Sequence, residues 1–361
     1  MTQRLEWVDI FKAVAIIAIV IGHSGSPTPI FNLMYAFHLP AFFFISGYVF
    51  NPQKAFFLVV KDRFKRLLVP YLSFALLFIG LHAILRILNS DTFFYDSTPV
   101  EITSPLFILK SVITTSYINP LAGITWFLWV LFETTLFSAL LIKVLQRYHI
   151  SYLLLCLPMI GLFLFGVLVI YPRYPVTSWP YYLDINFATI PYFLLGFLAQ
   201  YYEVFRKKCL LLWLSPLMMI IFYIFAWKHN AAVGFIFREF NYWYYFIPAS
   251  LAAFVCLFSF STFVEMVGWL KQVFTFIGKR TLSIMCLHLF AFKIVFIFLS
   301  WLGVSPTKII ACSLIPQTAY FWGILTVLSI SVSLILSKLI EKNRYFSFFF
   351  LGISESKKEL S

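Results

Sequence analysis

The stretch FKAVAIIAIVIGHSG, residues 11–25, decides the fold class. Its run of isoleucine, valine and alanine has the composition of a helix that crosses a lipid bilayer. Lys12 stands at the start of this run and His23 at its end. Ionisable side chains within a membrane span are costly and usually face a cavity or a partner. The stretch therefore predicts a membrane helix with a functional face.

The composition extends this prediction to the whole chain. Of the 361 residues, 62% are hydrophobic and only 11% are charged, and the mean hydropathy is +0.92. A water-soluble domain carries roughly 25% charged residues. We therefore expect an all-α integral membrane protein that crosses the bilayer many times. The five cysteines are scattered singly and predict neither a disulfide framework nor a metal site.

Ten stretches are apolar enough to cross the hydrocarbon core, which takes about 20 residues of helix. The second is interrupted by His38-Leu39-Pro40 and is expected to break there. The apolar stretch 105–118 is short, so we expect it to be re-entrant or to lie at the interface. The ten predicted spans are residues 8–25, 33–50, 67–88, 124–146, 151–170, 186–202, 209–227, 242–262, 281–301 and 317–338.

The basic residues orient these helices. With the N-terminus in the cytoplasm, 19 of the 27 lysines and arginines fall in inside segments and 6 in outside segments. The positive-inside rule predicts this asymmetry, which accounts for the net charge of +13 without a nucleic-acid partner. We expect both termini in the cytoplasm, a single bundle over residues 1–345 and a short cytoplasmic tail over 346–361.

Helical geometry places three ionisable groups on one face of the first span. Lys12 and His23 point within about 20° of each other and lie about 16 Å apart along the axis. Asp9 is about 60° from Lys12, so we expect it to pair with Lys12 or a nearby arginine. His38 lies a short connection from His23, but no third ligand at a suitable spacing supports a metal site.

Further candidates lie along the later spans. Arg63 and Arg66 are three residues apart at the cytoplasmic start of the third span, and paired guanidinium groups bind phosphate well. Ordinary positive-inside flanking explains them equally well. Glu133, seven residues after Trp126, and His288 are ionisable or polar groups within spans and are site candidates on that ground, with a structural role for His288 as the alternative.

Three motifs in order carry a resemblance to a known family. They are D-x-x-K-x10-H on the first span, FHLPAFFFISGY at 37–48 and R-x-x-R-x-x-x-P-Y beginning at Arg63. Together they resemble membrane-bound acyltransferase family 3, which includes the O-acetyltransferases of bacterial surface polysaccharides such as lipopolysaccharide and capsule. The stretches GITWFLWVLF at 123–132 and IGKRTLSIMCLH at 277–288 are also similar. The family usually has arginine where this chain has Lys12, which keeps the charge.

The resemblance implies transfer of an acyl group, most often acetyl, from cytoplasmic acetyl-coenzyme A to a sugar hydroxyl at the outer face. Asp9, Lys12, Arg63 and Arg66 would hold the coenzyme, and its acyl-bearing arm would thread along the first span. His23 would be the catalytic residue, as general base or as a transient acyl-histidine. His38, Trp126, Glu133 and His288 would bind the acceptor. No metal is implied.

The same resemblance implies a multi-pass protein of the bacterial inner membrane. Its expected partners are membrane lipid and a glycan or lipid-linked sugar acceptor, with no nucleic acid; a homo-oligomer is compatible with the sequence. No stretch reads as an extracellular esterase domain, so the chain either acylates its acceptor directly or hands the acyl group to a separate protein. The alternative function is a transporter or flippase of a glycan precursor, although the sequence lacks the two related halves typical of transporters.

Overall fold

The computed structural model describes residues 5–87, 123–174, 179–240, 242–302 and 321–353. Within these ranges the protein is helical and contains no β-strand beyond one isolated bridge. Nine helical runs in the described ranges are long and apolar enough to cross a membrane. Helix α1, Glu6–His23, is a further apolar helix, and it carries Glu6, Asp9 and Lys12. The prediction of an all-α membrane bundle is confirmed.

The helices follow the predicted spans closely, although the apolar stretch 105–118 lies outside the described residues. Several spans consist of two or three helical segments each. Within them, π-helical turns join or extend the α-helices, at Phe64–Leu68, Gly166–Ile170 and Tyr223–Lys228. Besides α1, the helices are α2 (Thr28–Tyr35), α3 (His38–Tyr48), α4 (Phe56–Arg63), α5 (Val69–Ile87), α8 (Trp126–Arg147), α9 (Cys156–Phe165), α10 (Tyr171–Arg173), α11 (Asn186–Tyr201), α12 (Lys208–Phe222), α13 (Trp243–Glu265), α14 (Gly268–Gly278), α15 (Thr281–Trp301), α17 (Trp322–Lys342) and α18 (Arg344–Leu351).

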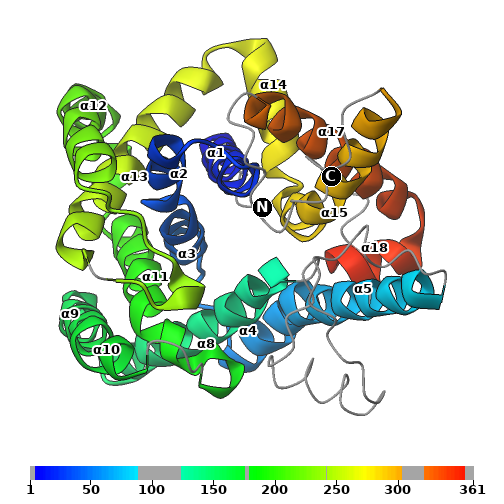
Figure 1. Ribbon diagram of the computed structural model, residues 1–361. Coiled ribbons are helices and arrows are strands. Elements are labelled where there is room, and N and C mark those ends of the chain that lie inside the picture. The colour runs from blue at the N-terminus through cyan, green and yellow to red at the C-terminus, as the bar shows by residue number, and fades with distance from the viewer. Residues whose placement is uncertain (1–4, 88–122, 175–178, 241, 303–320, 354–361) are drawn as a thin grey trace.

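Helix α1 lies inside the bundle, surrounded by α2, α3, α13, α14, α15 and α17 (Figure 1). Aromatic rings from three other segments pack around its N-terminal half. The Trp7 ring lies 4.9 Å from that of Tyr48, 5.4 Å from that of Phe205 and 5.2 Å from that of Phe258, measured between centroids. Such ring contacts add to the packing of a helix whose surroundings are otherwise apolar.

The second span is broken where the sequence predicts it. Helix α2 ends at Tyr35 and α3 begins at His38, with Pro40 in the first turn of α3, where proline fits without losing a hydrogen bond. Helix α3 then runs back alongside α1, because Tyr48 at its end meets Trp7 near the start of α1. The break therefore keeps Tyr35 and His38 near the end of α1 that carries His23.

The third span begins about eleven residues earlier than predicted, at Phe56, and contains a π-turn over Phe64–Leu68. Pro70 follows this turn. Proline has no N–H to donate and its ring crowds the carbonyl four residues earlier, which favours a wider turn. The wider turn also increases the angle between residues three apart. Arg63 and Arg66 therefore do not share the face that a regular helix would give them: Arg63 is half-buried and Arg66 is exposed.

Two short helices on the predicted cytoplasmic side have no counterpart among the predicted spans. Helix α14 packs along α1, and α18 packs against α5 and α17 (Figure 1). Both alternate apolar and polar residues at helical spacing, which suits a helix lying at a membrane surface. Helix α18 places the first residues of the predicted tail against the bundle, with Gly352 close to the backbone of Lys65 and Arg66.

Helices α3 and α11 cross closely at two glycines. A methyl group on Gly47 would lie 1.8 Å from the carbonyl oxygen of Phe193, and one on Gly196 would lie 1.9 Å from that of Phe44. Small residues allow this close backbone approach between membrane helices.

Alanine at this crossing should destabilise the protein. We expect Gly47→Ala and Gly196→Ala each to lower stability by about 1–3 kcal/mol or more, because backbone atoms must move to admit the methyl group. The matched control is Gly80→Ala, where a methyl group on α5 meets nothing within 4 Å. It should leave stability unchanged or raise it by about 0.5–1 kcal/mol through helix propensity. Thermal unfolding in detergent measures all three variants, and equal stability of Gly47→Ala and Gly80→Ala would contradict the packing argument.

Candidate active site

The two ends of α1 are named after the predicted topology: the end near Lys12 is the inner end, and the end at His23 is the outer end. The inner end carries a buried ion pair. Lys12 Nζ lies 2.7 Å from Asp9 Oδ1, as the sequence predicts, and the Asp9 side chain is 3% exposed against 25% for Lys12. The carboxylate thus lies within protein, while part of the lysine remains accessible. Asp9 thus compensates the ammonium charge of Lys12 within the membrane span, and the accessible part of Lys12 can still bind a second anion.

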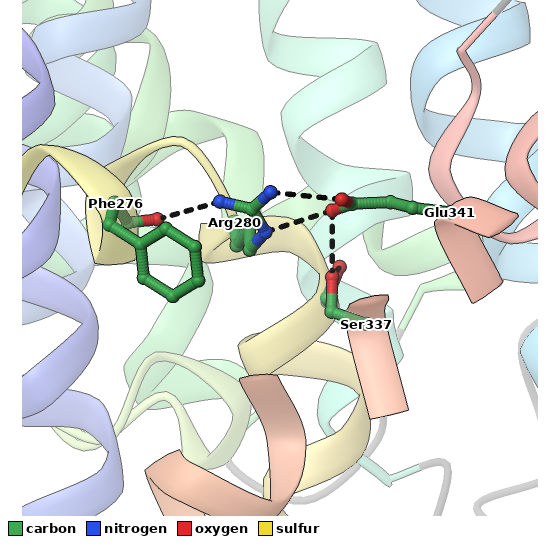
Figure 2. A network of polar contacts seen from close by, with 5 residues as sticks. Phe276, Arg280, Ser337 and Glu341 are labelled. Carbon is green, nitrogen blue, oxygen red and sulfur yellow. Dashed lines mark hydrogen bonds and ion pairs between the residues drawn. The ribbon is translucent and has the colours of Figure 1, made fainter. Parts of the chain in front are cut away.

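Backbone packing fixes the position of Asp9. A methyl group on Gly278, at the end of α14, would lie 1.8 Å from the Asp9 carbonyl oxygen. Two residues later, Arg280 donates from Nε and Nη2 to the two carboxylate oxygens of Glu341 on α17, each at 2.9 Å (Figure 2). Such a two-point pair is more directional than a single contact. It ties the corner between α14 and α15 to α17, and with it the backbone that covers Asp9.

A second contact reinforces this corner. The Arg280 guanidinium carbon lies 4.1 Å from the centre of the Phe276 ring, and Lys338 Nζ lies 5.1 Å from the same centre. The Ser337 hydroxyl lies 3.3 Å from Glu341 Oε1 and 2.8 Å from Ser283 Oγ, and its single hydrogen bonds one of these oxygens at a time (Figure 2 shows the contact with Glu341). The stretch 277–288, selected from sequence for its family resemblance, thus begins at a structural corner.

The outer end of α1 brings three histidines and a tyrosine together. The His23 ring centroid lies 5.4 Å from that of His288 on α15 and 6.2 Å from that of Tyr35 on α2. The Tyr35 ring in turn lies 4.6 Å from that of His38. His23 and His38, which the sequence places near each other, therefore both lie next to Tyr35. We call these four residues the histidine cluster.

Local structure holds the cluster in place. Gly22 gives room for Tyr35, since a methyl group there would lie 2.7 Å from the tyrosine ring. Phe31 stacks on Tyr35 at 3.9 Å between centroids. His38 donates from Nδ1 to the Met34 carbonyl oxygen at 2.6 Å, because a carbonyl can only accept. Tyr35 was missed by the sequence analysis, although its place three residues before His38 puts it on the same short turn.

The face of α1 between Lys12 and His23 is closed. Ile16 and Ile19 lie on that face, about 40° and 20° from the direction of Lys12, and they are 0% and 4% exposed. The two ends share a direction, but packed isoleucine side chains separate them in this structure, so an acyl-bearing arm that threads along the first span would meet these side chains.

The predicted phosphate-binding residues stand on two separate parts of the bundle. Arg63 and Arg66 lie on the segment that packs against α8, whereas Lys12 lies on α1 among a different set of neighbours. A molecule that touched all three side chains would have to bridge these helices. The chemistry of phosphate binding still favours the predicted residues, which are Lys12, Arg63 and Arg66.

Glu133 on α8 is held by the protein itself. Its Oε1 accepts from Trp129 Nε1 at 2.8 Å and its Oε2 accepts from Asn186 Nδ2 at 2.7 Å. Thr134 donates to Asn186 Oδ1 at 2.8 Å. Both carboxylate oxygens thus have donors on the chain, and their effect is to orient Trp129 and to join α8 to α11.

Aromatic residues from the outer loop cover this part of α8. The Tyr181 ring stacks on Trp129 at 5.5 Å, and the Tyr182 ring lies 6.1 Å from that of Trp126. Both tyrosines have left-handed backbone angles, φ 63° and 59°, which L-residues rarely adopt. Trp126 is itself buried.

A buried ion pair holds this strained segment. Arg238 donates from Nε to Asp184 Oδ2 at 2.6 Å and from Nη2 to Oδ1 at 3.1 Å, and the side chains are 4% and 0% exposed. Tyr171 donates to the Asp184 carbonyl oxygen at 3.0 Å. Arg238 is not among the site residues predicted from the sequence. The sequence could have indicated this pair through Arg238 and Asp184, which lie in two separate aromatic-rich segments predicted to face outside.

No group of three or more His, Cys, Asp or Glu side chains within the described ranges has a geometry that could hold a metal ion. The histidine cluster is included in that statement. Its chemistry in this structure is that of imidazole and phenol groups, which can move protons or act as nucleophiles.

Breaking the outer ion pair should destabilise the fold. We expect Arg238→Gln to cost about 3–5 kcal/mol, because Asp184 then stays buried without a charged partner. The matched control is Arg206→Gln, since Arg206 pairs with Glu203 on the surface with side chains 75% and 58% exposed. That substitution should have little effect. Thermal unfolding midpoints compare the two, and an equal loss in both variants would contradict a special role for the buried pair.

Comparison with known proteins assigns the chain to a family. Searches of curated proteins and of solved structures found no match. The family model described as "Acyltransferase domain" matches residues 5–338, which include the helices of the inner end, the histidine cluster and the α8 region. The chain therefore belongs to acyltransferase family 3.

Proposed function

We propose that this acyltransferase moves an acyl group, acetyl in the first instance, from cytoplasmic acyl-coenzyme A to a hydroxyl of a glycan or lipid-linked sugar at the outer face. The observation that carries the proposal is the arrangement of α1. A partly accessible lysine marks its inner end, and a histidine in contact with other imidazole and phenol rings marks its outer end.

The donor end follows from charge. Lys12 keeps part of its surface accessible although Asp9 binds it, and Arg63 and Arg66 add two guanidinium groups on the predicted cytoplasmic side. The diphosphate and phosphate groups of a coenzyme A carry several negative charges, which such groups bind through charge-assisted hydrogen bonds. Asp9 limits the position of the Lys12 ammonium rather than touching the coenzyme.

The reaction is assigned to His23. As a general base, one ring nitrogen takes the proton of the sugar hydroxyl while the oxygen attacks the thioester carbonyl; the C–S bond breaks and the sulfur leaves as a thiol after receiving that proton. As a nucleophile, the same nitrogen attacks the thioester carbonyl, the C–S bond breaks and the coenzyme leaves as a thiolate; the sugar hydroxyl then attacks the acyl-histidine, the C–N bond breaks, and the hydroxyl proton neutralises the thiolate. Both routes give one ester and one free coenzyme.

The acceptor is assigned to the outer region. His38 and Tyr35 adjoin His23, and Trp126, Trp129 and Tyr181 supply aromatic rings that suit stacking on a sugar. Because Glu133 is bonded to Trp129 and Asn186, its contribution is to orient Trp129. We place the protein in a bacterial inner membrane, compatible with a homo-oligomer and with transfer directly to the acceptor.

A transporter or flippase of a glycan precursor is the second candidate. Ten spans with charges among them suit it, but the acyltransferase family match favours group transfer. The two functions separate experimentally, since only the first consumes the thioester.

The first test follows radiolabel from acetyl-coenzyme A in inside-out vesicles. We expect wild type to label a glycan, and His23→Ala to reduce labelling about 10²–10⁴-fold through loss of the proton-transfer group. His149→Ala, on an exposed loop, is the control and should label as wild type does. Full labelling by His23→Ala would remove the catalytic assignment, and no labelling by wild type would favour transport.

The donor site has its own test. We expect Lys12→Ala to raise the KM for acetyl-coenzyme A about tenfold or more, as loss of a charge-assisted hydrogen bond of about 1.5–3 kcal/mol requires. Lys12→Arg should largely restore it. Lys271→Ala is the matched control, because Lys271 also pairs with a carboxylate of α1, Glu6, at 2.6 Å. A KM unchanged in Lys12→Ala argues against donor binding at the inner end.

A further inference from the structure

The protonation pattern of His288 can be read from its partners. Its Nδ1 lies 3.0 Å from the Ile284 carbonyl oxygen and 2.9 Å from that of Met285. Carbonyl oxygens only accept hydrogen bonds, so Nδ1 carries the hydrogen. In a neutral imidazole, Nε2 on the opposite edge of the ring then presents a lone pair.

That lone pair has no partner. Nε2 of His288 is fully buried and forms no hydrogen bond with any of the described residues. A buried acceptor left unpaired costs about 1–3 kcal/mol, so such an atom in a native structure calls for an explanation. The ring of His23 lies next to the ring of His288, with centroids 5.4 Å apart and planes inclined by 36°.

The separation of the two rings fits a hydrogen bond between them. Two imidazoles joined by an N–H···N bond of about 2.9 Å have ring centroids roughly 5 Å apart. A small rotation of His23, whose ring is partly accessible, brings one of its nitrogens into line with Nε2. On its other side, Tyr35 limits the swing of the His23 ring, and Gly22 lets Tyr35 approach.

We propose that His288 is a positioning residue for His23: its Nε2 accepts a hydrogen bond from an N–H of His23 and thereby leaves the other nitrogen of His23 unprotonated and aimed at the substrate. The proposal rests on the proposed function and replaces the expected acceptor-binding role of His288. The reactive nitrogen is the same whether His23 acts as base or nucleophile. When His23 gains a proton or an acyl group, the shared hydrogen bond becomes charge-assisted and stronger.

This role differs from a purely structural one. The contact between α15 and α17 uses the His288 backbone, because Ser329 Oγ donates to the His288 carbonyl oxygen at 3.0 Å. The Nδ1 bonds stay within α15. Loss of Nε2 therefore acts on His23 without removing a packing hydrogen bond of the His288 ring. Substitutions can test the roles of Nδ1 and Nε2 separately.

Three variants make that separation. His288→Gln places an amide oxygen near the position of Nε2, His288→Asn places an amide near the position of Nδ1 alone, and His288→Phe keeps the volume with neither. With purified full-length protein in liposomes, acetyl-coenzyme A and the glycan of native membrane vesicles, we expect kcat to fall less than about tenfold in the Gln variant. We expect a fall of about 10²-fold or more in the Asn and Phe variants, with KM for the donor unchanged within twofold.

The activity series overturns the proposal if the Asn variant keeps wild-type kcat, since only the structural edge of the ring would then matter. It also overturns the proposal if the change appears in KM for the acceptor rather than in kcat, which would restore the acceptor-binding role. Thermal unfolding of each variant identifies any that has lost its fold, and such a variant is judged by the measurement below.

Nitrogen-15 NMR of histidine-labelled wild type tests the pair without using activity. We expect His288 protonated at Nδ1 and His23 held in a single tautomer with a coupling across its N–H to Nε2 of His288; in the Phe variant His23 should become a mixture. Two tautomers of His23 in the wild type would contradict the proposed hydrogen bond between His23 and His288. Absence of acetyl transfer by wild type with a locked His23 overturns the proposed function instead, so the two failures are distinguishable.

Discussion

A lysine and a histidine on one membrane helix must obtain every polar partner from the protein, because the hydrocarbon core offers none. Much of the architecture around α1 follows from this constraint. Asp9 binds Lys12, and Gly278 brings the α14 backbone onto the Asp9 backbone. At the other end, Gly22 admits Tyr35 beside His23, and α15 supplies His288. Helix α1 therefore lies inside the bundle, because its charges would make it a poor span at the lipid surface.

The sequence predicts the spans well because a membrane imposes one simple rule, about 20 apolar residues for each crossing. The pairing of Asp9 with Lys12 and the closeness of His23 and His38 were likewise predictable, since both follow from helical spacing or a short connection. The break before His38 could be located from Pro40. These features depend on residues near one another in the chain.

Other features depend on neighbours that the sequence alone does not reveal. Glu133 looks like an open site residue until Asn186, 53 positions later, occupies one of its oxygens. The divergence of Arg63 and Arg66 comes from a π-turn, which Pro70 favours but does not dictate. The surroundings of Ile16 and Ile19 are set by packing, so helical periodicity could align the two ends of α1 but not show that the line between them is closed.

That closure suits the proposed chemistry. A standing polar path from Lys12 to His23 would let protons and ions cross the membrane, whereas packed isoleucines prevent it at no cost in unpaired polar groups. On the proposed function, the acyl-bearing arm must displace these side chains or pass beside them, and the energy for this comes from the part of the donor that does not react. Binding of the coenzyme phosphates to Lys12 and the arginines can offset the disturbance of packing, in the way that remote binding energy supports distortion at a reacting centre. On the proposed function, the charged end and the packed stripe of α1 therefore have complementary roles: one supplies binding energy and the other prevents a standing polar path.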